Sequence, residues 1–555
     1  MLTVTTNSWH LHKASILAPS MTETLPSEFE VIVVGTGLVE SMVAAAAARM
    51  GHSVLHVDTA KFYGGDWASF TWDGLQEWIN DSDEPKSRTE EIGLEEGEEI
   101  IYLAKNKSAS DLRENWFCES EGNHVKTELK EATQHSESDT SVTFKETEKT
   151  WNREMLKSQS RKFNLDLTPR LLFARGPMVE LLISSNISRY TEFKSVTRVL
   201  TLLDGNLEQV PSSRSDVFNT KHINVVEKRI LMKFLTQCLH EDIDAINSST
   251  NFGDYLKSHK LTANLTHFIV NSIAMTPTDA PVRIGLESTQ KFLASLGRFG
   301  PTPFLWSMYG TGELPQAFCR LCAVFGGIYY LGRTVEGIVI KEEMATAVLI
   351  EEKKIKCKHL VLPEHRIPNK FSSNTNSTET TSRAIIISKE SLLPTEKEQI
   401  TFISLPSNFG KPVNIIEVGQ GTAACPKGLH VLHASVAGDA DCEHILRESG
   451  IIKDENLVYS LTFTQTGSLR AFKTGVKNLW SACGPISELD FDSAIEQARE
   501  IYTGMFPGEE FLPRAPDPEE IILGEENSES KDIESQIETS GETSDRNVEC
   551  DASHE

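Results

Sequence analysis

The residues whose types and spacing most clearly indicate chemistry are Gly35 and Gly37, which stand in the run Val-Gly-Thr-Gly-Leu. Gly35 suits the tight turn that follows a strand. Gly37 would let the backbone approach a diphosphate at the N-terminus of the next helix. Asp58 ends the next apolar run and is counted with the same motif. This spacing predicts a dinucleotide site.

Two departures from the motif argue against a working site. Glu40 occupies the third glycine position, so its carboxylate would face a diphosphate of like charge. Residues 474–485 are similar to the late strand of two-dinucleotide-fold flavoproteins, but Pro485 follows Gly484 where those proteins normally have aspartate. We interpret the motif as vestigial, in a flavoprotein scaffold that has lost its flavin and binds no cofactor.

A β-α-β unit would position this motif. The β-branched run 30–34 predicts a strand, the alanine-rich run to Met50 predicts a helix, and residues 54–58 predict a second, parallel strand. The aromatic-rich loop 62–70 follows and includes Tyr63. Such a loop either packs against the rest of the protein or forms a contact surface for a partner.

A second polar group lies in the run Gly-Glu-Leu-Pro-Gln. Pro315 suits the first position of a helix, and Gly326 suits its C-terminal cap. Gln316 and Arg320 share one face of this helix, and Glu313 stands just before it. From the residues alone this cluster is more typical of a solvated face. The opposite face is expected to be buried and consists of Phe318, Leu321, Cys322 and Phe325.

No catalytic or metal-binding constellation stands out. The 9 cysteines are scattered and odd in number, which suits a reducing compartment rather than a disulfide framework. Cys319 and Cys322 form a Cys-x-x-Cys pair with no second pair at zinc spacing, so a core role is favoured over metal or redox chemistry. His52 and His56 flank a buried strand and lack a partnered base. We predict no catalytic residue and no metal.

Length and charge limit the class of protein. The chain has 555 residues, enough for more than one domain, and a formal charge of −26 that makes nucleic acid a poor partner. Residues 516–555 carry 14 acidic and 2 basic side chains, a net charge of −12. Apolar runs stay well below the ~20 residues of a membrane span. A cytoplasmic protein is expected.

The sequence pattern divides the chain into several parts. Residues 1–26 are expected to form a disordered extension, in which Met21 is an alternative start, and 511–555 an acidic disordered tail. Weak periodicity predicts a partly disordered acidic insertion at 81–159. Apolar residues at helical spacing predict a helical domain at 210–299. The remaining ranges form one discontinuous α/β domain: 27–80, 160–209 and 300–510.

The last part of the α/β domain is expected to be rich in strands. Its β-branched apolar runs alternate with polar and glycine-containing segments. The expected strands are 335–350, 355–362, 383–388, 399–405, 429–436 and 457–463, and the expected last helix is 491–506. The fold class is therefore α/β, with a FAD/NAD(P)-binding-like multi-sheet domain and an inserted all-α domain.

Several ordered motifs resemble the superfamily of Rab GDP-dissociation inhibitors and Rab escort proteins. The resemblance covers residues 29–75 and 161–523, and the run 312–316 is its most specific motif. The other runs that carry it are 35–38 with Glu40, 63–65, 226–229 with 233–234, and 309–327. Similarity to the escort branch rests on the acidic insertion and tail and on 65–70, 161–167, 272–276, 322–329 and 518–523.

The resemblance implies a GDI-like fold and a non-catalytic role. Escort proteins bind newly made, GDP-bound Rab GTPases, present their C-terminal cysteines to the α/β dimer of Rab geranylgeranyltransferase, and carry the product to membranes. Phe268 matches an aromatic residue that would contact the transferase, with a place in the core as the alternative. The Rab-binding platform of the family falls on Tyr63, Glu313, Gln316, Arg320 and Tyr330.

The geranylgeranyl group would travel as part of the client Rab. At ~0.8 kcal/mol per buried CH₂, a twenty-carbon chain would gain roughly 10 to 16 kcal/mol by leaving water. Helices part more easily than a closed sheet, so residues 210–299 are the expected lipid carrier. Two alternatives stay open: a dissociation inhibitor that only recycles Rabs, and a flavin-dependent oxidoreductase.

Overall fold

The computed structural model describes most of the chain between residues 25 and 514. The described ranges are 25–81, 93–104, 107–118, 151–211, 223–246, 250–351, 353–371, 378–406, 412–469 and 474–514. Almost all of the predicted N-terminal extension and acidic tail, and residues 119–150 of the predicted insertion, lie outside these ranges.

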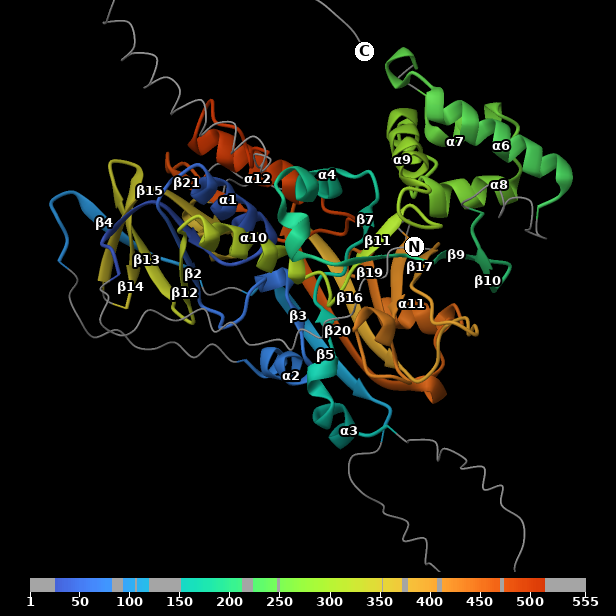
Figure 1. The fold of residues 1–555 in the computed structure, drawn as a ribbon, viewed down its shortest axis with the longest axis horizontal. Coiled ribbons are helices and arrows are strands. Elements are labelled where there is room, and N and C mark those ends of the chain that lie inside the picture. Colours follow the sequence, from blue (N-terminus) through green and yellow to red (C-terminus); the bar gives the residue numbers. More distant parts are fainter. Residues whose placement is uncertain are drawn as a thin grey trace, which may run out of the picture.

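The first sheet contains the predicted β-α-β unit (Figure 1). β1 (Glu28–Val34) pairs in parallel with β2 (Val54–Asp58) and β15 (Lys353–Pro363), and α1 (Leu38–Arg49) makes the crossover, which confirms that prediction. The strand order is β12-β2-β1-β15-β14-β13-β4, with β21 paired to β15. The other strands are β12 (Ile328–Leu331), β13 (Val335–Lys341), β14 (Met344–Ile350), β4 (Glu98–Tyr102) and β21 (Leu479–Ala482).

Three helices cover one face of this sheet: α1, α10 (Glu313–Val324) and α12 (Asp492–Met505). α1 is buried from Leu38 to Ala48, because its alanines let α10 and α12 pack closely on both sides. The opposite face of the sheet has its own apolar core, which includes Ile32 and Leu360. The first sheet is therefore covered on both faces along its central strands.

The apolar run 335–350 is a hairpin of β13 and β14, so the prediction of one strand is wrong. Lys341 pairs with Met344, and the residues between them, Glu342 and Glu343, have φ angles of 51° and 60°. Positive φ at both central residues gives the turn that matches the twist of antiparallel strands. Glutamate rather than glycine or asparagine occupies the turn, so no standard turn signal marked it.

The second sheet has the order β10-β9-β17-β18-β19-β16-β20-β5 and is antiparallel except for the β9–β17 pair. The expected strands in 383–463 correspond to β16, β17, β19 and β20. Helix α11 (Cys442–Glu448) packs on one face. The strands are β5 (Ala109–Trp116), β9 (Arg198–Leu203), β10 (Asn206–Gln209), β16 (Thr378–Ser388), β17 (Thr401–Leu405), β18 (Val413–Val418), β19 (His430–Ala437) and β20 (Leu457–Ser468).

The polar stretch 81–159 contributes a strand to each sheet. β4 pairs with β13 at the end of the first sheet, and β5 pairs with β20 at the end of the second. Within the described part of the chain, each is the last strand of its sheet, and exposed residues interrupt the burial pattern of both. The weak hydrophobic periodicity of this stretch therefore reflects its position at the sheet ends.

The described residues between 223 and 295 form the helical region, at the upper right of Figure 1. Its helices lie within the range predicted for a helical domain. Lys291 Nζ lies 2.6 Å from Asp492 and also pairs with Asp490, so charged contacts tie α9 to the start of α12. The helices are α6 (Val225–His240), α7 (Phe252–Ser258), α8 (Ala263–Phe268) and α9 (Val282–Ser295), with a π-helix at Ile269–Ile273.

Short elements join these parts. The remaining strands are β3 (Ser69–Phe70) with β6 (Leu165–Asp166), and β7 (Leu172–Phe173), β11 (Phe304–Ser307) and β8 (Phe193–Ser195) in the order β7-β11-β8. The other α-helices of the described residues are α2 (Trp72–Asn80), α3 (Arg153–Ser158) and α4 (Pro177–Ser184). Single 3-10 turns span Gly65–Trp67, Ser160–Lys162, Ile187–Tyr190, Ile243–Ala245, Glu364–Arg366, Asn369–Phe371, Gln420–Thr422 and Asp454–Asn456.

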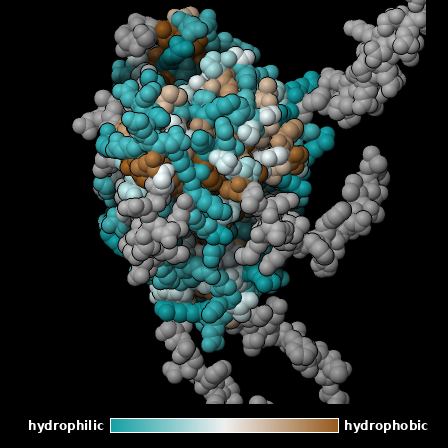
Figure 2. All heavy atoms as spheres, turned by 90° about the vertical axis from the view of Figure 1, so that its left-hand side faces the viewer, coloured by the Kyte–Doolittle hydropathy of each residue, from teal (hydrophilic) through white to brown (hydrophobic). Residues whose placement is uncertain are grey.

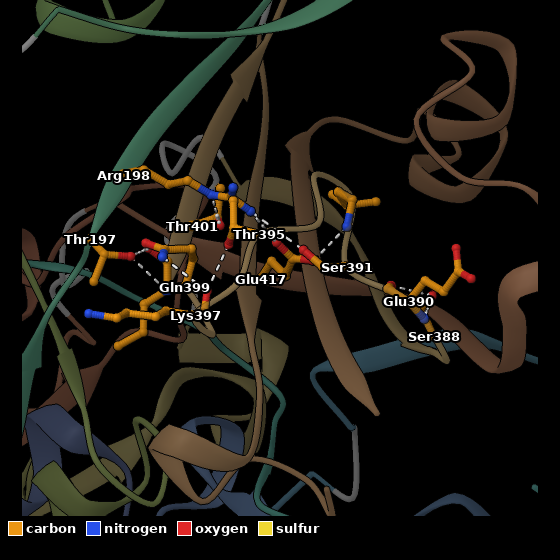
Figure 3. Close-up of polar contacts among 12 residues, drawn as sticks. Thr197, Arg198, Ser388, Glu390, Ser391, Thr395, Lys397, Gln399, Thr401 and Glu417 are labelled. Carbon is orange, nitrogen blue, oxygen red and sulfur yellow. Dashed lines mark hydrogen bonds and ion pairs between the residues drawn. The ribbon is translucent and has the colours of Figure 1, made fainter. Parts of the chain in front are cut away.

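A buried ion pair fixes the loop between β16 and β17 (Figure 3). Arg198 Nη2 lies 3.4 Å from Glu417 Oε2, and Arg198 Nε donates to Thr401 Oγ1 at 2.7 Å. Glu417 Oε1 also accepts from the backbone N–H of Leu392 at 2.7 Å. Loss of either charge would leave the other buried and unpaired, so this pair holds the loop against the sheet.

The end of the molecule that carries β4, β13 and β14 is mostly polar. Figure 2 shows that hydrophilic side chains cover most of this face, with apolar groups in small patches between them. Among the described residues, no helix combines the length and hydropathy needed to cross a bilayer.

Candidate functional site

The β1–α1 turn forms the predicted dinucleotide cradle, and its own side chains fill it. Gly35 has φ +88°, and Gly37 is the N-terminal cap of α1 without a side-chain hydrogen bond. A Cβ on Gly37 would lie only 2.5 Å from Glu40 Oε2, so the Glu40 carboxyl group lies directly against the helix N-terminus. Burial raises the pKa of Glu40 to about 8. The obstacle to a diphosphate is therefore the bulk of a largely neutral acid, rather than the like charge that the sequence argument assumed.

The rest of the cradle is also occupied from within the chain. Asp58 Oδ2 accepts from the N–H and hydroxyl of Thr36 at 2.8 and 2.6 Å, and its Oδ1 accepts from Ala60 N at 2.9 Å. Gly64 N donates to Thr36 Oγ1 at 3.1 Å, which pulls the aromatic loop over the turn. The cavity that remains measures about 120 Å³, below the roughly 300 Å³ at which ligand pockets begin. These residues do not fit a dinucleotide.

Helix α10 carries the second candidate group and differs from expectation at both ends. It begins at Glu313 with Gly312 as the cap, so Pro315 is the third helical residue rather than the first. Phe325, expected to be buried, is 46% exposed, because the helix ends before it and its ring leaves the buried face. Gly326 follows with φ +88°, as the predicted cap requires.

The polar side chains of α10 lie on the predicted face. Gln316 and Arg320 are exposed, and the Arg320 guanidinium stacks 4.6 Å from the centre of the Tyr190 ring. Glu313 is half-buried, and burial together with the nearby carboxylates of Asp166 and Glu192 raises its pKa to about 7. This surface therefore presents an acid, an amide and a cation along one helix.

The structure places the two predicted platform tyrosines differently. The ring of Tyr63 packs edge-on against Tyr329 at 5.8 Å, and burial and nearby Cys319 of α10 raise the pKa of Tyr63. Tyr330 is next to Tyr329 on β12, so its side chain points to the opposite face of the sheet. There its hydroxyl lies 3.4 Å from Glu351 Oε2. Tyr63 thus lies near the buried Cys319 of α10, and Tyr330 lies at the sheet edge beside Glu351.

The residues that hold the start of α10 were not identified from the sequence. Asp166 is fully buried and accepts from Thr311 N at 3.0 Å and from the hydroxyl of Ser69. Tyr309 has φ +65° and is 42% exposed. The signal for Asp166 was present, because an aspartate between two leucines in a strand-like run requires hydrogen-bond partners.

Phe268 and the cysteine pair lie in the interior. Phe268 is 0% exposed and packs in the core of the helical region, so its side chain offers no surface. Burial raises the pKa of Cys319 to about 12 and that of Cys322 to about 11, which keeps both thiols protonated and unreactive. Within the described residues, no group of three or more metal-ligating side chains comes together.

With this geometry in view, comparison with known proteins defines the family. The family model described as "GDI: GDP dissociation inhibitor" matches residues 25–95 and 130–448. The chain therefore belongs to the GDP dissociation inhibitor family, and the predicted GDI-like fold is confirmed. Among solved structures, Rab GDI from Plasmodium falciparum matches with a TM-score of 0.63 and 16% identity, covering 89% of this chain and 100% of that one.

Named relatives are similar over nearly the whole chain. Identity is 33% to "Rab proteins geranylgeranyltransferase component A 1" of Rattus norvegicus, over 94% of this chain and 98% of that protein. It is 35% to "Rab proteins geranylgeranyltransferase component A" of Drosophila melanogaster, over 91% and 94%. The "Rab GDP-dissociation inhibitor" of Saccharomyces cerevisiae is 26% identical over 76% of this chain and 82% of its own length.

Proposed function

We propose that this chain is the non-catalytic component A of a Rab geranylgeranyltransferase. The observation that carries the proposal is its 33 to 35% identity to proteins of that name over 91 to 94% of its length. In this role it binds unprenylated, GDP-bound Rab GTPases, presents them to the transferase α/β dimer, and accompanies the prenylated product to membranes.

The Rab-binding platform is proposed to centre on the exposed face of α10. Arg320 is held by the Tyr190 ring, and Glu313 lies at the start of the same helix. An acid, an amide and a cation in one row can make several charge-assisted hydrogen bonds to a folded GTPase. Tyr63 adds an aromatic surface beside them. Tyr330 would extend the contact only along the β12 edge.

The filled cradle supports a role without a cofactor. Glu40 occupies the N-terminus of α1, and the hydrogen bonds of Asp58 are made within the chain. In this proposal the flavin site is lost, and the β-α-β unit serves as a rigid support for α10. The geranylgeranyl group is carried only as part of the client Rab.

The helical region is proposed to face the transferase and the lipid. Its described α-helices leave Val225, Val226 and Ile284 exposed, and helices can separate to admit an apolar chain. Phe268 supports this region from inside, because its ring is fully buried. The acidic chain, with no described helix able to cross a bilayer, suits a cytosolic carrier that meets membranes transiently and binds no nucleic acid.

The decisive experiment is a reconstituted prenylation reaction. Purified transferase α/β dimer, GDP-bound Rab and labelled geranylgeranyl diphosphate are combined with and without the full chain. Label should enter Rab only when the chain is present. If the chain fails to support transfer but extracts prenylated Rab from membranes, it is a recycling inhibitor, the alternative that the family match also allows. A flavin absorbance spectrum in the purified protein would instead indicate an oxidoreductase.

The platform is tested by Arg320→Ala. Loss of its charged contacts should weaken Rab binding by about 1 to 3 kcal/mol while the melting temperature stays unchanged. Arg113→Ala is the matched control. Arg113 is an exposed arginine on β5 of the second sheet, and its Nη1 lies 3.9 Å from Asp441 Oδ2. Equal Rab affinity for both variants would show that Arg320 is not part of the platform. Isothermal titration with GDP-bound Rab measures both.

A further inference from the structure

The turn that begins α10 rests on one buried carboxylate. Asp166 on β6 is 0% exposed, and its register partner on β3 is Ser69. Asp166 accepts from Thr311 N at 3.0 and 3.1 Å, from Thr311 Oγ1 at 3.2 Å, and from Ser69 Oγ. Ser69 Oγ in turn accepts from Gly312 N at 2.8 Å. Each described hydrogen-bonding partner of the carboxylate is a donor, so the ionised form satisfies all of them. Burial raises the pKa of Asp166 to about 6, which leaves it mostly ionised at neutral pH.

The glycines of this turn are explained by the same contact. A Cβ on Gly310 would overlap Asp166 Oδ1 and Ser69 Oγ, and one on Gly312 would lie 2.6 Å from Ser69 N. Gly310 also has φ +95°. The turn can lie this close to Asp166 only because both positions lack side chains.

The backbone turn before α10 also fixes the position of Glu313, the acid of the predicted platform. Glu313 N donates to Gly310 O at 3.3 Å, and Tyr309 N donates to Thr422 O at 3.2 Å, so the backbone on both sides is fixed. The acids that face Glu313 are Asp166 from β6 and Glu192 just before β8. The cation nearest along the helix, Arg320, lies about two turns away and stacks on Tyr190. No described lysine or arginine forms an ion pair with Asp166 or Glu313.

We propose that Asp166 is a positioning residue for Rab recognition: it holds the Tyr309–Gly312 turn and so fixes Glu313 where the GTPase meets α10. This inference rests on the proposed function. It assigns a role to a residue that cannot touch the partner, and it explains why an exposed platform depends on a buried β3–β6 pair.

The first test compares Asp166→Asn and Glu313→Gln in the full chain by titration with GDP-bound Rab. Asn keeps the size of the side chain but replaces one acceptor with a donor, so the turn should loosen and affinity should fall at least about tenfold. Asp73→Asn, an exposed acid on α2, is the control and should bind as the parent. If Glu313→Gln binds normally, the platform assignment fails. If Glu313→Gln is weakened and Asp166→Asn is not, only the positioning role fails.

A pH profile separates positioning from a general loss of structure. Burial is the main cause of the raised pKa of Glu313, and the charge of Asp166 adds to it. In Asp166→Asn the second contribution is lost, so the midpoint of the pH dependence of Rab affinity should move to lower pH. A merely structural defect would lower affinity at every pH without moving the midpoint. If Asp166→Asn fails to fold, Ser69→Ala is the second variant. It removes both the donor to Asp166 and the acceptor for Gly312 N, and should cost about two- to fivefold in affinity. Unchanged affinity and midpoint in a folded Ser69→Ala protein would overturn the proposal.

Discussion

The N-termini of α1 and α10 share the same local sequence features but differ in their exposure. Each helix is capped by a glycine without a side-chain hydrogen bond, and each has a glutamate in its first turn. Glu40 lies beneath the aromatic loop and is 6% exposed, whereas Glu313 is only half-buried and follows the exposed Tyr309 by four residues. What covers the helix end, rather than the motif itself, therefore decides how far the end is exposed.

This difference indicates how a cofactor fold can serve protein recognition. The first helix end is the phosphate-binding position in dinucleotide folds, and here it is closed from within. The neighbouring helix, packed directly on α1, presents its polar face outward.

The largest expected effect is on the stability of the turn that begins α10. Gly310→Ala should destabilise the protein by about 3 kcal/mol, because the new methyl group overlaps Asp166 and the backbone has φ +95°. Gly326→Ala is the control, since it shares a positive φ of 88° but has open space around it, and should cost only about 1 kcal/mol. Equal losses in urea unfolding would mean that the contact with Asp166 is unimportant.

The next effect concerns Glu40, the buried acid at the N-terminus of α1. The pKa of Glu40, about 8 in the fold, lies above its usual value, so the native state keeps a proton that the unfolded chain releases. Stability should therefore decrease as pH rises from about 4.5 to 8. Glu40→Gln does not ionise, so it should already be more stable than the parent at pH 6 by about 2 kcal/mol, with little difference at pH 4. Parallel pH profiles for the two proteins would contradict this.

Crowding between Gly37 and Glu40 should give a smaller effect. Gly37→Ala should cost about 1 to 2 kcal/mol, because its Cβ would lie 2.5 Å from Glu40 Oε2, although that side chain can shift. In the Glu40→Ala background the same change should cost less than half as much. A double-mutant cycle by thermal unfolding measures the coupling, and strict additivity would show that the carboxyl group does not fill the cradle.

The smallest expected effect concerns the contact between Arg320 of α10 and the ring of Tyr190. Tyr190→Leu removes the ring under Arg320 and should weaken Rab binding about twofold to threefold, the size of an exposed cation–π contact. In the Arg320→Ala background Tyr190→Leu should have no further effect. A loss that persists there would indicate that Tyr190 contacts the GTPase itself.

Local patterns were enough to predict some elements but not others. The β-α-β unit followed from β-branched and alanine runs, and the exposed face of α10 followed from the spacing of Gln316 and Arg320. The turn at Glu342 and Glu343 escaped because those residues rarely adopt positive φ. Asp166 could not be connected to α10, since that contact joins residues 145 positions apart through the fold.

The two strands from the polar stretch 81–159 have a consequence for solubility. β4 and β5 occupy the free ends of the two large sheets, and their exposed residues include Glu99, Asp111 and Arg113. Without them, the apolar strands β13 and β20 would present unpaired backbone to other molecules, a template for aggregation. The stretch thus insulates a Rab-binding protein from sticking to copies of itself.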